Sequence, residues 1–104
     1  MKKYLMIAAG VVALSATGPV QSADLEAGKA LYQTCITCHG PAGQGQAIFP
    51  ALTGKDIEYL IDKLTRYRAG EQVGPHTALM APHASALSDD DIANVAAFIA
   101  EEFN

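Results

Sequence analysis

Apolar residues recur at helical spacing in three stretches of the chain. The clearest stretch lies between residues 56 and 69, where the apolar positions follow the i, i+3, i+4, i+7 pattern of an amphipathic helix. They are Ile57, Leu60, Ile61, Leu64 and Tyr67. We therefore predict a helix from about Asp56 to Ala69, which Gly70 ends.

The other two stretches flank this one. We predict a first helix from Asp24, a suitable N-cap, to about Thr37. Its apolar stripe is formed by Leu25, Gly28, Leu31, Tyr32 and Cys35. The last helix begins at Ser88-x-x-Asp91, which resembles a capping box. Its buried stripe is predicted to be Ile92, Val95, Ala96, Ile99 and Phe103.

Gly28 stands in the middle of the first predicted helix. A glycine there costs about 1 kcal/mol relative to alanine. We therefore expect a close helix crossing at this point, with Gly28 packed against Phe98 or Ala97 of the last helix.

Segments rich in glycine and proline separate the helices. Residues 40–54 contain four glycines and two prolines, and residues 71–85 include Gly74-Pro75 and Ala81-Pro82, so both are predicted to be loops. No stretch shows the alternation of a β-strand. The prediction is a small all-α domain of three helices, with room for one extra short helix.

The first 22 residues have the pattern of a secretory signal peptide. Lys2 and Lys3 form a basic start, an apolar run covers residues 4–16, and small residues follow at a cleavage site after Ser22 or Ala23. The alternative, an uncleaved membrane anchor, is disfavoured because the apolar run is short and is followed by Gly-Pro. We expect export from a bacterial cytoplasm and a single domain over residues 23–104.

The mature chain is short and acidic. About 82 residues bury only ~60% of their unfolded surface, so a cofactor would help the domain to fold. Without Lys2 and Lys3 it has five basic and eleven acidic residues, a net charge of −6. No basic patch predicts binding to nucleic acid, and the acidic surface argues against stable membrane insertion.

The chemistry is concentrated in Cys35-Ile36-Thr37-Cys38-His39. Cys-x-x-Cys-His is the attachment sequence for c-type haem. On one helical turn, residues i and i+3 share a face, so both thiols can reach the two vinyl groups of one porphyrin edge. The histidine that follows is placed to bind the iron. A thioredoxin-like use of the cysteines is unsupported, because no βαβ pattern surrounds them.

Several further segments occur in the order found in small monohaem proteins. They are Gly28, the Cys35-x-x-Cys38-His39-Gly40 motif, Pro50-Ala51-Leu52-x-Gly54, Tyr67-Arg68-Ala69-Gly70, Met80, and Leu87-Ser88-Asp89-Asp90-Asp91-Ile92 followed by Ala96-Ala97-Phe98-Ile99. Over essentially the whole mature chain the sequence resembles the class I c-type cytochromes of bacteria. The resemblance implies a cytochrome c fold wrapped around one covalent haem c.

The iron of a redox carrier needs a second axial ligand. From the residues alone, Met80 competes with His76 and His83, which flank it in the same segment. The resemblance implies Met80, because the family places a methionine about 40 residues after the attachment motif. A thioether is a soft ligand that favours Fe(II) and so raises the reduction potential.

The resemblance also implies an acceptor for the second ring nitrogen of His39. In similar proteins this acceptor is the backbone carbonyl of the proline in the Pro-x-Leu loop, here Pro50. Partners for the haem propionates stay open at this stage. The candidates are Lys55, Lys63, Arg66, Tyr67 and Arg68.

Three functions fit a haem domain of this size. The first is a periplasmic electron carrier, not an enzyme, that shuttles single electrons between membrane or soluble oxidoreductases. The second is a haem-bearing subunit of a larger complex, such as a dehydrogenase of sulfur compounds; the sequence does not distinguish a monomer from such a subunit. The third is a peroxidase, which would need an open iron and an acid/base group such as His83.

Overall fold

The computed structural model describes residues 23–104, and within them the chain forms five α-helices and no β-strand. The helices are α1 (Leu25–Tyr32), α2 (Ile36–His39), α3 (Ile57–Arg68), α4 (Thr77–Ser85) and α5 (Asp89–Glu102). The expected all-α class is therefore confirmed. The predicted signal peptide, residues 1–22, lies outside the described residues. Of the helices that the structure describes, none combines the length and apolar character needed to cross a membrane.

Side-chain caps start three of the helices where the sequence predicts them. Asp24 Oδ1 accepts a hydrogen bond from the amide of Ala27 at 3.1 Å, and Asp56 Oδ1 accepts one from the amide of Tyr59 at 2.8 Å. Ser88 and Asp91 form both hydrogen bonds of a capping box. These bonds satisfy amides that have no partner inside the helix.

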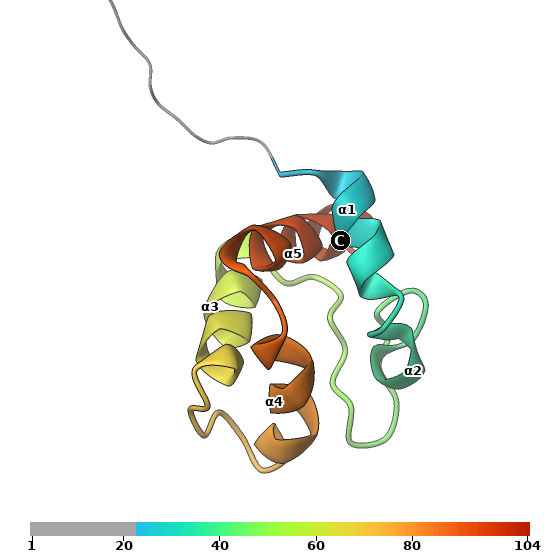
Figure 1. Ribbon diagram of the computed structural model, residues 1–104. Helices are drawn as coiled ribbons and strands as arrows, with labels where there is room; N and C mark the ends of the chain where they lie inside the picture. Colours follow the sequence, from blue (N-terminus) through green and yellow to red (C-terminus); the bar gives the residue numbers. More distant parts are fainter. Residues whose placement is uncertain (1–22) are drawn as a thin grey trace, which may run out of the picture.

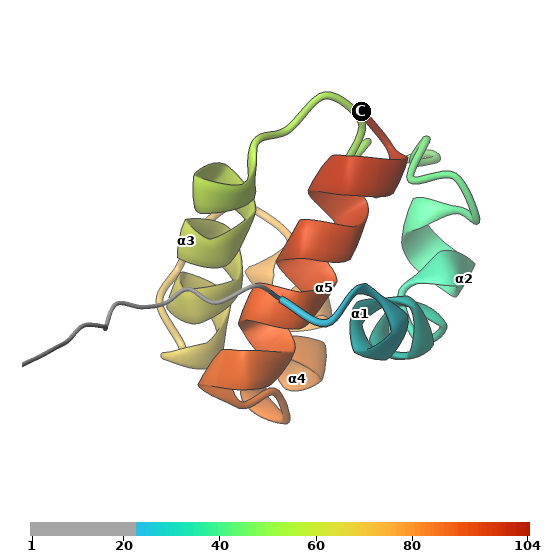
Figure 2. The same cartoon turned by 90° about the horizontal axis from the view of Figure 1, so that it is seen from above.

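Helix α5 lies at the centre of the domain, with α3 on one side and α1 on the other (Figures 1 and 2). The buried core joins the three helices and consists of Tyr32, Leu60, Val95, Ala96 and Ile99. The rings of Tyr32, Phe98 and Phe103 extend this core, with centroids 5.0–5.8 Å apart in tilted and edge-on contacts. Four residues of the predicted stripe of α5 are thus buried, Ile92, Val95, Ala96 and Ile99, while Phe103 at the C-cap is partly buried. Leu25 of the first predicted stripe is 42% exposed.

Helices α1 and α5 cross at Gly28. A β-carbon built on Gly28 would overlap the carbonyl oxygen of Asn94 and lie 2.8 Å from the β-carbon of Phe98. The expected crossing against Phe98 is present, and Asn94 is a second contact that the sequence did not indicate. The Asn94 side chain also accepts a hydrogen bond from the amide of Asp24 at 2.9 Å.

The first predicted helix is too long by five residues. Helix α1 ends at Tyr32, and the short helix α2 begins at Ile36. Between them, the amides of Gln33, Thr34 and Cys35 donate to carbonyls three residues back, which is a tighter turn than the α-helix. Because of this turn, the attachment motif lies at a separate short helix, α2, and not at the end of α1.

The prediction of a loop over residues 71–85 is wrong in its second half, because Thr77–Ser85 forms α4 and includes Met80. Pro82 lies inside this helix, where a proline removes one hydrogen bond. The helix nevertheless forms because it packs against α3, with Thr77 and Ala84 buried.

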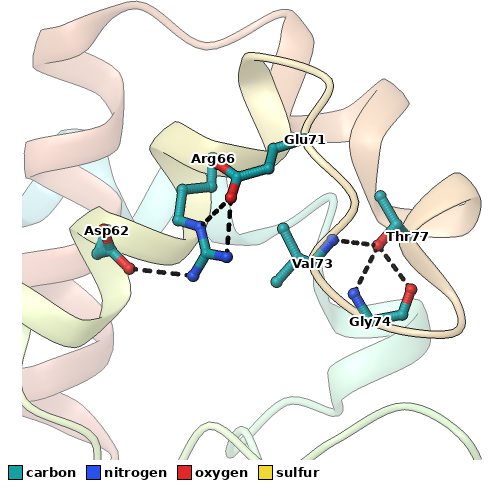
Figure 3. A network of polar contacts seen from close by, with 6 residues as sticks. All are labelled: Asp62, Arg66, Glu71, Val73, Gly74 and Thr77. Atoms are coloured by element: carbon teal, nitrogen blue, oxygen red, sulfur yellow. Dashed lines mark hydrogen bonds and ion pairs between the residues drawn. The ribbon is translucent and has the colours of Figure 1, made fainter.

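A network of polar contacts fixes the segment between α3 and α4 (Figure 3). Arg66 is paired with Asp62 of α3 and, at 2.9 Å, with Glu71 of the connecting segment. The Thr77 hydroxyl accepts hydrogen bonds from the amides of Val73 and Gly74 at 2.9 and 2.8 Å and donates to the carbonyl of Gly74. The start of α4 is thereby tied to the segment that follows α3.

Candidate haem site

A cavity of ≈ 410 Å³ lies between the helices and the loop of residues 40–56. Its size is in the range of sites that hold small molecules and cofactors. Its wall is mostly apolar and includes Leu31, Leu52, Leu60, Leu64, Val95 and Ile99. Several of these, such as Leu31, Leu52 and Leu64, are only partly buried in the protein alone, so a large apolar ligand would complete their burial.

Both cysteines of the attachment motif line this cavity. Cys35 is the N-cap of α2 with helical backbone angles, and Cys38 lies in the same turn. The two thiols are free and half-buried. Burial, together with the neighbouring Cys38, raises the pKa of the Cys35 thiol above its ordinary value, although a hydrogen bond with Thr34 opposes this. This thiol is therefore protonated at neutral pH.

His39 ends α2 and is buried against the loop that follows. Its Nδ1 lies 2.8 Å from the carbonyl oxygen of Pro50. A carbonyl only accepts, so Nδ1 carries the proton and the free electron pair belongs to Nε2. This hydrogen bond fixes the ring and leaves Nε2 as the ring nitrogen that is free to bind a metal.

The loop is held so that Pro50 reaches His39. The amide of Gly45 donates to the carbonyl of His39 at 2.7 Å, and the amide of Leu52 donates to the carbonyl of Gly43 at 2.7 Å. Gly43 and Gly45 have positive φ angles, which favour glycine, and a β-carbon at Gly45 would lie 2.6 Å from the amide nitrogen of Ala51. Two glycines thus let the loop fold back tightly.

Two of the three candidate second ligands, Met80 and His83, lie on α4, and the third, His76, is its N-cap residue. His76, Met80 and His83 are spaced i, i+4 and i+7, and all three line the cavity. Met80 is half-buried, whereas both histidines are exposed. The structure therefore brings Met80 into the cavity with His39 and the two cysteines, and it leaves the histidines nearer the solvent.

The candidates for the propionates separate into two groups. Arg66 and Arg68 do not line the cavity, since Arg66 pairs with Asp62 and Glu71 and Arg68 with Asp89. Lys55, Lys63 and Tyr67 do line it. Tyr59 lines it as well, and sequence reasoning missed this residue because it lies outside the apolar stripe of α3.

This donor set suits haem c. Two thiols on one helical turn, an oriented imidazole and a thioether face one apolar cavity. Thioether bonds to the thiols would hold the porphyrin, His39 would bind the iron, and the apolar wall would cover the ring. Haem supplies the one-electron chemistry, in which iron changes between Fe(II) and Fe(III).

The cytochrome c family matches residues 25–101. The chain belongs to the cytochrome c family. It is 45% identical over 80 residues to cytochrome c-554(548) of Halomonas halodenitrificans. This match covers 76% of this chain and 96% of that protein. It is 42% identical over 67 residues to a thiosulfate dehydrogenase electron acceptor of Stutzerimonas stutzeri, covering 64% of this chain but 31% of that protein.

The fold also matches a solved cytochrome c. The reduced cytochrome c4 of Pseudomonas stutzeri has a TM-score of 0.69 and 28% identity over 86% of this chain. This chain spans 55% of that cytochrome c4, about half its length. The predicted family, the covalent haem c and the electron-transfer function are therefore confirmed by the family match and these likenesses.

Proposed function

We propose that this cytochrome c is an exported, periplasmic carrier of single electrons whose haem is attached to Cys35 and Cys38 and whose iron is held by His39 and Met80. The observation that carries the proposal is the meeting of these four side chains at one apolar cavity, although Met80 comes from a helix about 40 residues away. Export is supported by the signal-peptide pattern of residues 1–22, with cleavage after Ser22 or Ala23.

An iron with both axial positions occupied favours an electron carrier over an enzyme. A peroxidase needs an open sixth position and an acid/base group beside it. Met80 closes that position, and His83, the residue that could act as acid/base, is exposed. With both axial positions taken, the protein would exchange electrons through the haem edge without binding a substrate at the iron.

The partner is a redox protein, and one relative suggests its class. That relative is named an electron acceptor of thiosulfate dehydrogenase, so a dehydrogenase of sulfur compounds is a candidate donor for this chain too. The proposal covers a free carrier and a haem subunit docked on such an enzyme, because both use the same site.

The test is the mass and the spectrum of the protein purified from the periplasm of a host that attaches haem c. The denatured mass should equal the chain from Ala23 or Asp24 plus one haem. The reduced form should show sharp low-spin bands, and the oxidised form should add the weak far-red band of methionine ligation. Free thiols with extractable haem would overturn the attachment, and high-spin iron that binds carbon monoxide rapidly would overturn the carrier.

A further inference from the structure

The wall of the haem cavity differs in charge from the rest of the chain. The mature sequence has eleven acidic and five basic residues. Among the described residues that line the cavity, however, there are two lysines, Lys55 and Lys63, and no aspartate or glutamate. The cavity wall is therefore positively charged, although the mature protein as a whole is acidic.

The two lysines converge on one aromatic ring. Lys55 precedes the N-cap of α3, and Lys63 lies one turn after Tyr59 on that helix. Their Nζ atoms are 5.2 and 5.4 Å from the centroid of the Tyr59 ring. A ring attracts a cation at such distances, but two cations around one ring also repel each other.

No carboxylate in the described part of the chain forms an ion pair with either lysine. The ion pairs there join Arg66 to Asp62 and Glu71, and Arg68 to Asp89. Glu71 is the carboxylate that Lys63 influences: a hydrogen bond with Arg66 and, more weakly, the charge of Lys63 lower the pKa of Glu71. The carboxyl of Asp56, between Lys55 and α3, caps the helix. Lys55 and Lys63 thus form half-buried positive charge at the cavity, which suits a ligand with carboxylates.

We propose that Lys55 and Lys63 bind the propionate carboxylates of the haem, with the Tyr59 ring between them. Haem c has its two carboxylates on the porphyrin edge opposite the one that the cysteines hold. Their partners must therefore come from elements other than α2, and α3 with its preceding residue supplies them. Of the basic side chains proposed from the sequence, these two are the ones that the structure leaves at the cavity. The inference rests on the covalent haem of the family and does not depend on Met80 as a ligand.

The two lysines should also affect the reduction potential of the haem iron. A positive charge close to the haem disfavours Fe(III), which carries one more positive charge than Fe(II). Lys55 and Lys63 should therefore raise the reduction potential of this cytochrome. They should also lower the pKa of the propionates that they bind, because an opposite charge within about 4–6 Å favours the ionised carboxylate.

The test uses the intact haem protein with Lys55→Gln, Lys63→Gln, the double variant, and Lys29→Gln as the matched control. Lys29 is an exposed lysine of α1 that does not line the cavity. At a fixed applied potential, each cavity variant should lower the Fe(II)/Fe(III) ratio by about threefold to tenfold. Lys29→Gln should leave the ratio nearly unchanged, and Lys63→Arg should retain most of the wild-type value.

A second measurement addresses the propionates themselves. Nuclear magnetic resonance of the propionate methylene groups in the reduced protein gives their titration directly, and at least one propionate pKa should rise by about one unit in the cavity variants. The other titratable groups that face the cavity are His39, Tyr59, Tyr67, His76 and His83. They are the same in every variant, so the difference from wild type isolates the lysines.

Two results would overturn the proposal. One is a potential and a propionate pKa in Lys55→Gln and Lys63→Gln that match those of Lys29→Gln. The other is an unchanged potential with slower electron exchange toward an acidic redox protein, which would make the lysines a docking site. Neither result depends on the sixth ligand, which has its own spectral signature.

Discussion

Gly28 of α1 lies directly against the backbone carbonyl of Asn94 in α5, with no room for a β-carbon between them. We expect Gly28→Ala to destabilise the protein although alanine is the better helix former. Forcing a methyl group into a packed contact costs about 1–3 kcal/mol, against about 1 kcal/mol gained from helix propensity. The net loss should be about 1 kcal/mol in the free energy of unfolding, measured by denaturant titration of the haem protein.

Ala30→Gly is the control for this prediction. Ala30 is an exposed residue of the same helix, so its replacement reports propensity alone and should cost about 1 kcal/mol. A Gly28→Ala variant that is more stable than wild type would show that the two helices can separate without penalty.

Local sequence patterns predicted the helices that begin with a side-chain cap. Helices α3 and α5 begin within one residue of the predicted positions, because Asp56 and the Ser88–Asp91 capping box supply their first hydrogen bonds. The attachment motif is likewise local: five consecutive residues identify the cofactor. The hydrogen bond from His39 to Pro50 followed from the resemblance and is present in the structure.

Helix α4 could not be predicted in the same way. Its start at His76 has no side-chain cap, it contains Pro82, and its apolar residues do not gather on one face. What stabilises α4 is contact with α3, together with the Thr77 hydroxyl bonded to the preceding turn. The role of Tyr59 was missed for a related reason, since its neighbours Lys55 and Lys63 meet it only in three dimensions.

The hydroxyl of Tyr32 gives a prediction about alkaline pH. It is buried and donates to the carbonyl of Gly40 at 2.6 Å. Burial raises the pKa of Tyr32 from 10.0 to about 12. Between these values the unfolded chain loses the proton while the folded chain keeps it, so the stability that Tyr32 confers is complete below pH 10 and is lost as the pH rises toward 12.

Tyr32→Phe should remove this part of the pH dependence. At pH 7 the variant should lose about 1 kcal/mol, a modest amount because the Gly40 carbonyl still accepts from the amide of Gly43. Its unfolding free energy should then fall less steeply than that of wild type between pH 10 and 12. Equal slopes for wild type and Tyr32→Phe would contradict the assignment.

Thr77 should control how firmly α4 holds Met80. Thr77→Val keeps the shape of the side chain but leaves the amides of Val73 and Gly74 without their acceptor (Figure 3). These amides are half-buried, and leaving such donors unsatisfied costs up to about 1–3 kcal/mol, so α4 should detach more readily. We expect the oxidised protein to bind added imidazole at least several-fold more tightly, measured by loss of the far-red band.

Thr77→Ser restores the acceptor and should recover the wild-type affinity for imidazole. Thr65→Val, at an exposed threonine of α3, is the matched control and should have no effect. If Thr77→Val and Thr65→Val bind imidazole equally, the hydroxyl does not fix the position of α4.

The sixth ligand is tested by Met80→Ala, which should leave the haem attached and the five helices in place. Water, or His76 or His83 from the same cavity wall, would then occupy the iron. Water would give high-spin iron that binds carbon monoxide and reacts with peroxide. An imidazole would keep the iron low-spin but, as the stronger donor, would stabilise Fe(III). The potential should therefore fall in both cases, and the far-red band should disappear.

His76→Ala and His83→Ala are the controls, because both side chains line the same cavity and neither is expected to bind the iron. Each should keep the wild-type spectrum and nearly the wild-type potential. Combining Met80→Ala with both histidine substitutions should remove any replacement imidazole and leave high-spin iron at neutral pH. If one histidine variant loses the low-spin signature while Met80→Ala retains it, the cytochrome has two histidine ligands and works at a lower potential. The covalent haem and the role in electron transfer would survive that result, because they rest on the attachment motif and the family and not on the sixth ligand.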